Sequence, residues 1–221
     1  MKRLLVLTAT VILTAMLSQA ALAIPALQIY IPDATWNAST QTWVTEASDF
    51  ELWVIAANTD TKPLYDVTLV AALAGGQAPV AGALSIDGTN YNSFMYGTPP
   101  SWGNSEGGYP YHGVYPTNYM ELSVASLVNT YPETVHNMQP GKYDDTAPGK
   151  IFKFDVSTSY DWLHFDGYGF LNESDGHFKF VPNSHDGEKG RIPPPTIPEP
   201  STLLLVGSAL ALAGGIKKLR K

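Results

Sequence analysis

The sequence predicts an all-β domain, a β-sandwich of the jelly-roll or immunoglobulin-like kind, flanked by an N-terminal signal helix and a short C-terminal transmembrane helix. Apolar and polar side chains alternate with a period of two over many short stretches, as in strands with one buried face. Between the two ends, every window of helical length contains a Gly, Pro or Asn cluster, which disfavours helix. Many short strands joined by turns fit two antiparallel sheets packed face to face.

The alternation is clearest in the stretches "DFELWVIAAN" and "KIFKFDVS". In the first, Phe50, Leu52, Val54 and Ala56 share one face and Glu51, Trp53 and Ile55 the other. In the second, Phe152, Phe154 and Val156 alternate with Lys153 and Asp155. Further strands are expected at residues 27–31, 67–73, 83–86, 120–127, 163–171 and 178–181. Asp87-Gly88 and Asp175-Gly176 are hairpin signals between them.

The segment from Tyr96 to Tyr119 does not fit a strand, because it is rich in Gly, Pro and aromatic residues. A loop of this length is usually functional or disordered, and its tyrosines favour order. Its candidate ligand-binding residues are Trp102, Tyr109, Tyr111, His112 and Tyr115. Their rings, like those of Trp36 and Trp43, could stack on sugars or fill a core that has no cysteine to staple it.

The N-terminus has the three parts of a secretory signal peptide. Lys2 and Arg3 precede an apolar run at 4–17, and Ala21 and Ala23 form the small-x-small site, so we expect cleavage after Ala23. The alternative is an N-terminal anchor, for which the run is short of the roughly 20 residues needed to span a bilayer.

The C-terminal apolar run at 202–216 is also short. Its helix would rise about 22 Å, against a hydrocarbon core of about 30 Å. Cations follow it and would stay on the cytoplasmic side, which places the middle of the chain outside the inner membrane. These cations are Lys217, Lys218, Arg220 and Lys221.

Four parts therefore follow in order: a signal peptide at 1–23, a sandwich ectodomain at 24–191, a Pro-rich spacer at 192–197 and a tail at 198–221. Between residues 24 and 196, seven Lys or Arg stand against nineteen Asp or Glu, a net charge of −12. Such a surface repels nucleic acid and anionic lipid. The absence of cysteine excludes a thiol nucleophile and a thiolate metal site.

The tail resembles a known sorting signal. Pro198-Glu199-Pro200 directly before a short apolar helix and a terminal basic cluster is similar to the PEP-CTERM signal of Gram-negative, exopolysaccharide-producing bacteria. The resemblance implies processing by the membrane transpeptidase exosortase, a transient stay in the inner membrane, and transfer to the cell surface or extracellular matrix. The alternative is an ordinary tail anchor whose prolines end a linker.

The ectodomain has a second resemblance. The segments "YGTPPSWG", "YPYHGVYPTNY" and "VPNSHDGE" resemble sequences of the choice-of-anchor surface proteins, the N type in particular. The resemblance covers about residues 27–188. That group implies no established activity or ligand, so it supports the sorting prediction and leaves the biochemistry open.

Two motifs are candidates for chemistry. Gly103-Asn104-Ser105-Glu106-Gly107 fits a nucleophile elbow, but Gly107-Gly108-Tyr109-Pro110 cannot begin the helix that an elbow needs. Acids and histidines crowd together near the end of the ectodomain; they are His164, Asp166, Glu173, Asp175, His177, His185, Asp186 and Glu188. Asp175, His185 and Asp186 are candidate metal ligands. Carboxylates with backbone carbonyls would suit calcium and histidines on one face would suit zinc, and solvated turns with hydrogen-bonded histidines are the alternative.

Three functions remain open at this point. The first is a non-enzymatic surface or matrix protein linked to exopolysaccharide or biofilm, with no cofactor. The second is a carbohydrate-binding module, with calcium as an aid, and the third is a glycosidase-like enzyme. A deep cleft with paired acids would favour the enzyme, a flat strip of exposed aromatics the binding module, and a sealed surface the structural role.

Overall fold

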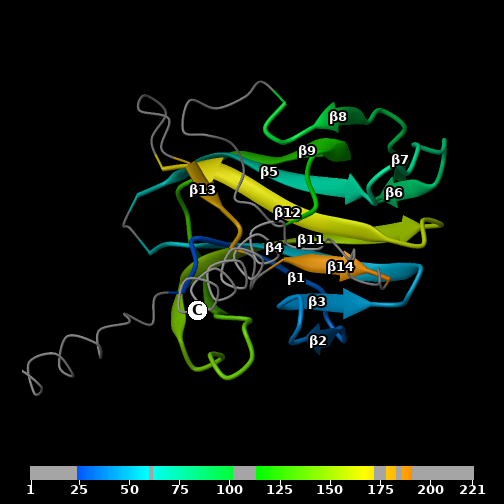
Figure 1. Ribbon diagram of the computed structural model, residues 1–221. Helices are drawn as coiled ribbons and strands as arrows, with labels where there is room; N and C mark the ends of the chain where they lie inside the picture. The colour runs from blue at the N-terminus through cyan, green and yellow to red at the C-terminus, as the bar shows by residue number, and fades with distance from the viewer. Residues whose placement is uncertain (1–23, 60–61, 102–112, 172–177, 183–185, 191–221) are drawn as a thin grey trace, which may run out of the picture. The chain divides into compact units, whose positions relative to one another are not determined.

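The described residues form fourteen strands and no helix, and Figure 1 shows how these strands are arranged. The computed structural model describes residues 24–59, 62–101, 113–171, 178–182 and 186–190. Contacts between residues divide the chain into two units, 1–191 and 192–221, and only the first contains described residues. The signal segment, the spacer and the tail therefore lie outside the described residues, as do both terminal helices predicted from the sequence.

The first sheet has the strand order β1-β4-β11-β6-β7, with β10 also paired to β11. Its strands are β1 (Leu27–Tyr30), β4 (Asp49–Ala57), β6 (Leu84–Ile86), β7 (Thr89–Asn90), β10 (Glu133–His136) and β11 (Thr146–Thr158). Every pairing in this sheet is antiparallel. The turn between β6 and β7 is Asp87-Gly88, where both residues have positive φ, as a two-residue hairpin turn requires.

The second sheet has the order β2-β3-β14-β12-β5-β9-β8, with β13 also paired to β12. Its strands are β2 (Thr35–Asn37), β3 (Thr42–Thr45), β5 (Leu64–Leu73), β8 (Met95–Gly97), β9 (Thr117–Val128), β12 (Leu163–Phe170), β13 (Phe178–Phe180) and β14 (Gly187–Lys189). The pairing of β14 with β3 is parallel, whereas β14 runs antiparallel to β12. The last strand of the domain, β14, thus lies between β3 from its beginning and β12, which also comes late in the chain.

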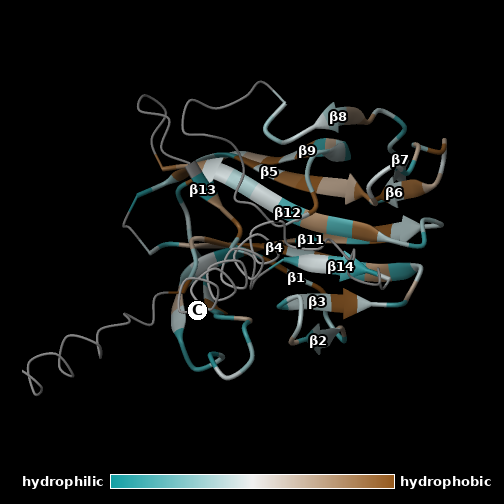
Figure 2. Cartoon of the chain, viewed as in Figure 1, coloured by the Kyte–Doolittle hydropathy of each residue, from teal (hydrophilic) through white to brown (hydrophobic). Residues whose placement is uncertain are grey.

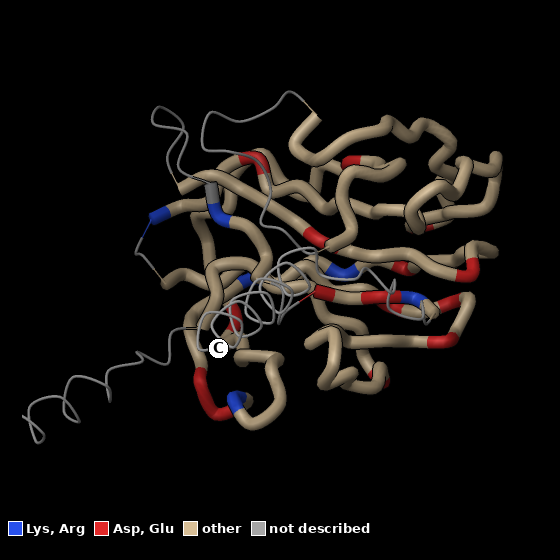
Figure 3. Tube along the Cα trace, viewed as in Figure 1, with Lys and Arg blue, Asp and Glu red and all other residues tan. Residues whose placement is uncertain are grey.

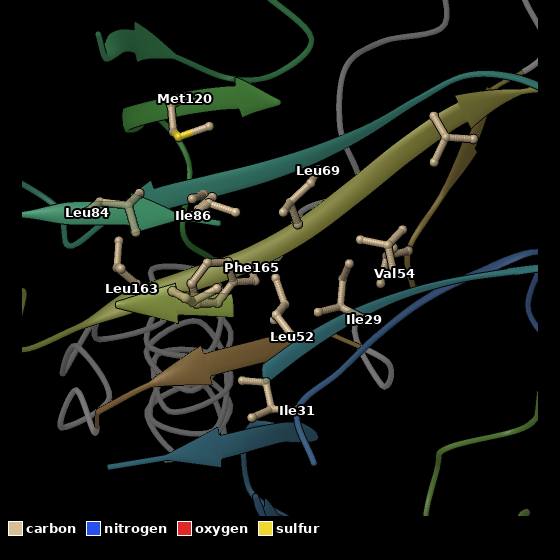
Figure 4. Close-up of a cluster of buried hydrophobic side chains, with 14 of the residues drawn as sticks. Ile29, Ile31, Leu52, Val54, Leu69, Leu84, Ile86, Met120, Leu163 and Phe165 are labelled. Carbon is tan, nitrogen blue, oxygen red and sulfur yellow. The ribbon is translucent and has the colours of Figure 1, made fainter. Parts of the chain in front are cut away.

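The core lies between the two sheets, as in a sandwich (Figure 4). Leu52 and Val54 of β4 share one buried cluster with Leu69 of β5 and Phe165 of β12. The ring of Phe50 meets that of Phe165 across the gap, with centroids 5.8 Å apart. Each fully buried side chain of this size contributes about 2 kcal/mol through removal of apolar surface from water.

The alternation seen in the sequence places these residues correctly. Figure 2 shows apolar and polar positions succeeding one another along the long strands. The predicted inward set of β4 belongs to the core, and so do Phe152, Phe154 and Val156 of β11. The all-β prediction is confirmed for the described residues, and the sandwich-like arrangement agrees with it. Strands β2, β3, β7, β8, β10 and β14 were not predicted from the sequence.

The outer faces carry smaller apolar clusters, and acidic residues outnumber basic ones along the trace (Figure 3). Outside the first sheet, Ile55 and Val135 are buried together, with Trp53 and Tyr30 beside them. Outside the second sheet, Val70, Ala72, Tyr119 and Tyr168 are buried together, with Tyr115 and Phe180 packed against them. Both outer faces are therefore partly covered by the chain itself.

Candidate functional site

A cluster of charged side chains lies on the outer face of the second sheet, where β12 and β14 are paired. Leu163 and Phe165 of β12 point into the core, so His164 and Asp166 point to the opposite face. Glu188 of β14 is the register partner of His164, and cross-strand partners share a face. Asp186 directly precedes β14, and its carbonyl accepts a hydrogen bond of 3.2 Å from the backbone N–H of Trp43.

Three carboxylates surround the imidazole of His164. Its Nε2 lies 3.7 Å from Oδ2 of Asp166 and 3.6 Å from Oδ2 of Asp186. Its Nδ1 lies 3.4 Å from Oε1 of Glu188. The other carboxylate oxygen of Asp166 accepts a hydrogen bond of 2.8 Å from the N–H of Gly167. These four side chains, His164, Asp166, Asp186 and Glu188, are called the His164 cluster below.

The cluster is closed to solvent. The side chains of His164, Asp166 and Asp186 are 1%, 0% and 2% exposed, and that of Glu188 is 12% exposed. Burial by itself would lower the pKa of His164, but the carboxylates of Asp166, Glu188 and Asp186 outweigh it and raise this pKa to about 10. The imidazole is therefore positively charged at neutral pH, and it holds together acids that would otherwise repel one another.

Two aromatic residues border the His164 cluster. The ring of Trp162 stacks on the imidazole with an interplanar angle of 16° and a centroid distance of 6.0 Å. Burial, followed by the nearby charges of Asp166 and Asp186, raises the pKa of Tyr115 well above its usual value. The Tyr115 hydroxyl thus lies close to these carboxylates and away from solvent.

The structure brings some of the predicted site residues together, and others lie outside the described residues. Of the acids and histidines that crowd near the end of the ectodomain, the structure brings together His164, Asp166, Asp186 and Glu188. Asp186 is the single member of the predicted metal-ligand set within the described residues, since Asp175 and His185 lie outside them. Across the described ranges, no group of three or more acid or histidine side chains is arranged to hold a metal ion.

The predicted ligand-binding loop is described only at its two ends. Tyr115 packs against the second sheet, and Trp102, Tyr109, Tyr111 and His112 lie outside the described residues. Four further predicted features lie outside the described residues: the serine of the candidate elbow (Ser105), the predicted cleavage site (Ala21 and Ala23), the Pro-Glu-Pro motif (Pro198, Glu199 and Pro200) and the basic tail (Lys217, Lys218, Arg220 and Lys221).

A shallow depression lies over β4, β6 and β11 of the first sheet. Its lining includes Asp49, Glu51 and Asp155 together with Ser85 and Ser157. Glu51 and Asp155 are register partners, and two like charges in that position repel. Glu51 also lies 3.7 Å from Nζ of Lys153, which offsets part of this repulsion.

Comparisons with known proteins give little further information. No family model and no curated protein matches the chain. A mutant of the CFA/I enterotoxigenic E. coli adhesin CfaE is similar at 11% identity over 76% of this chain and 49% of its own, with a TM-score of 0.28. The catalytic domain of a GH87 α-1,3-glucanase in complex with nigerose is similar at 16% identity over 81% of this chain and 31% of its own, with a TM-score of 0.17.

This chain thus spans about half the length of the adhesin chain and less than a third of the glucanase chain. At such low TM-scores neither likeness bears on function. Within the described strands and loops, no helix is long and apolar enough to cross a membrane.

Proposed function

We propose that the chain is an exported, non-enzymatic protein of the cell surface or extracellular matrix, delivered by an exosortase-type system. The observation that carries the non-enzymatic part is the burial of the His164 cluster. A general acid or base must come within hydrogen-bond distance of its substrate. Side chains that are 0–2% exposed do not reach a substrate in solution, whereas they can tie β14 to β12.

The sorting part of the proposal rests on the order of motifs along the chain. A signal peptide, a compact domain, a proline-rich spacer, Pro198-Glu199-Pro200, a short apolar run and a basic cluster follow one another. The boundary between the two contact-defined units, at residues 191 and 192, falls where the proline-rich spacer begins. The same proposal includes the finer fold assignment, a jelly-roll or immunoglobulin-like sandwich.

The motif itself suits recognition by a protease. Prolines on both sides disfavour helix at Glu199, so the sequence predicts an extended backbone that carries its carboxylate. The apolar run that follows is short and contains Gly207, Gly214 and Gly215, so it is a weak permanent anchor and an adequate temporary one.

The test is expression of the full chain in a host that has an exosortase. Glu199→Ala should block processing and leave full-length protein in the inner membrane, while the wild type reaches the surface without its tail. Glu133→Ala is the matched control, because Glu133 is an exposed glutamate of β10 and its loss should leave processing unchanged. Mass spectrometry of the surface fraction decides the outcome. Peptides from residues 203–221 in that fraction would show that the tail is an ordinary anchor.

A further inference from the structure

The long strand β9 lies at an edge of the second sheet for most of its length. On one side, β5 pairs with it from Tyr119 to Val128. On the other side, β8 pairs only with its first three residues, Thr117 to Tyr119; both strands lie at the top of the view in Figure 1. Among the described strands, none pairs with the outer side of residues 120–128. This stretch is called the β9 edge below, and an unpaired edge of this kind can accept another strand.

The first sheet has an unpaired stretch as well. Gly149 of β11 pairs with both β4 and β10, and Val156 pairs with both β4 and β6. β10 and β6 therefore share the edge of β11 that faces away from β4. Between them, residues 150–155 have no described strand on that edge.

The two unpaired stretches lie on the same side of the sandwich. A Cβ added at Gly187 of β14 would lie 3.3 Å from Ile29 of β1, so β1 lies over β14. Phe50 of β4 meets Phe165 of β12. The next strand of the first sheet, β11, therefore lies over the next strands of the second sheet, β5 and β9.

The core comes close to the surface on this side. Leu122 and Val124 of β9 and Phe152 and Phe154 of β11 all pack against the main core cluster, yet they are only half-buried. Leu69 of the neighbouring strand β5 belongs to the same cluster and is fully buried. A further strand beside β9 would remove more of this apolar surface from water.

The β9 edge has few of the features that protect a sheet edge from pairing. Its sequence, MELSVASLV, contains one charged residue, Glu121, and no Lys, Pro or Gly. Leu127 of this stretch is 43% exposed. A bulge at Val124 makes the edge less regular, which weakens pairing without blocking it.

We propose that the β9 edge pairs antiparallel with the β9 edge of a second copy of this chain, in a twofold-symmetric dimer. Around an axis near Val124, Glu121 of one copy faces Leu127 of the other, so no two acids face each other. The second copy's strand would end at Val128, opposite residue 120, and β8 begins opposite residue 119. β8 and the second copy's β9 thus lie end to end along one edge without overlapping.

Charge favours a second copy at this place over other places on the domain. The chain has a formal net charge of −7, so two copies repel each other over most of their surface. The β9 edge is nearly free of charge, and two copies approach there at the lowest electrostatic cost. A stable interface buries about 800 Å² on each partner, more than one short edge supplies, so we expect a weak dimer that depends on concentration. This inference goes beyond the proposed function, which assigns no self-association, and it can fail independently of the sorting proposal.

The first test is cross-linking of the purified full chain in a mild detergent. The sequence contains no cysteine, so a single introduced thiol reports on one position. Ser123→Cys and Ser126→Cys place exposed thiols on the β9 edge, and Ser39→Cys places one in the turn between β2 and β3, at the far end of the second sheet. A short bismaleimide should link the two β9-edge variants into dimers and leave Ser39→Cys unlinked. Equal linking of all three would show association through the apolar ends of the chain and would overturn the proposal.

The second test is sedimentation equilibrium of the same full chain. The dimer fraction should rise with protein concentration and with salt, because salt screens the repulsion between acidic copies. Ser123→Glu brings like charges together near the axis and should weaken association about fivefold. Ser39→Glu makes the same change in net charge away from the edge and should associate like the wild type; both side chains are exposed, so the melting temperatures should stay unchanged. A wild type that stays monomeric at every concentration, or a folded Ser123→Glu that associates like the wild type, overturns the proposal.

Discussion

Replacing His164 should destabilise the domain strongly at neutral pH and weakly at high pH. His164→Gln keeps a polar side chain of similar size but removes the positive charge that three buried carboxylates share. Breaking a buried ion pair by removing one partner costs about 3–5 kcal/mol. The raised pKa of His164 indicates a loss of similar size in the free energy of unfolding, because a rise from 6.5 to about 10 corresponds to about 5 kcal/mol.

The sign of the pH dependence follows from the raised pKa. The contribution of His164 is fully present below pH 6.5 and is lost as the pH rises through about 10. The difference in unfolding free energy between wild type and His164→Gln should therefore be large at pH 7 and small above pH 10. In a domain of this size the loss at pH 7 lowers the melting temperature by roughly 6–20 °C.

Urea unfolding followed by tryptophan fluorescence at pH 7 and pH 10.5 measures the loss of unfolding free energy and its dependence on pH. His136→Gln is the matched control, because His136 of β10 stacks on the exposed ring of Tyr143 and its Nδ1 contacts the carbonyl of Tyr143. The His136→Gln substitution should lower the free energy of unfolding by less than about 1 kcal/mol. A His164→Gln loss under 1 kcal/mol at pH 7, or an equal loss at both pH values, would refute the charged-cluster interpretation.

Two further predictions concern the backbone contact at Gly190 and the binding of a metal ion. Gly190→Ala should cost about 3 kcal/mol or more in urea unfolding, because a Cβ there would lie 1.8 Å from the carbonyl oxygen of Asp161. Gly76→Ala, at the same φ of +81° with open space around it, should cost only about 1–2 kcal/mol, and equal losses would show that the contact is not tight. If Asp175, His185 and Asp186 hold calcium, the ion at 100 times its dissociation constant should stabilise the fold by about 2.7 kcal/mol. Identical melting curves in millimolar calcium and in chelator would remove that hypothesis.

The long strands could be predicted from the sequence because alternation needs length to be visible. β4 and β11 show several alternating apolar positions each, and both were found. β2, β8 and β14 have three residues each, too few to display a period, and β14 is defined by partners distant in the sequence. Asp87-Gly88 was predicted as a turn because two successive positive φ values favour those residues.

The candidate sites could be predicted only in part. The crowding of acids and histidines indicated His164, Asp166, Asp186 and Glu188, but their burial depends on the pairing of β12 with β14, which no local pattern encodes. The aromatic contacts were invisible for the same reason. Trp36 and Trp43 stood out as aromatic residues, whereas the contact between the rings of Trp43 and Tyr30 arises from the packing of β3 beside β1.

The position of β14 constrains when the domain can fold. Its residues join the β2–β3 pair on one side to β12 on the other, and Gly187 pairs with Trp43 near the opposite end of the domain. Closing a loop of that length is entropically slow and must await nearly the whole polypeptide. A nascent chain can therefore not complete its second sheet until residue 189 has emerged. If the chain is exported, its second sheet would be completed only after residue 189 has crossed the membrane.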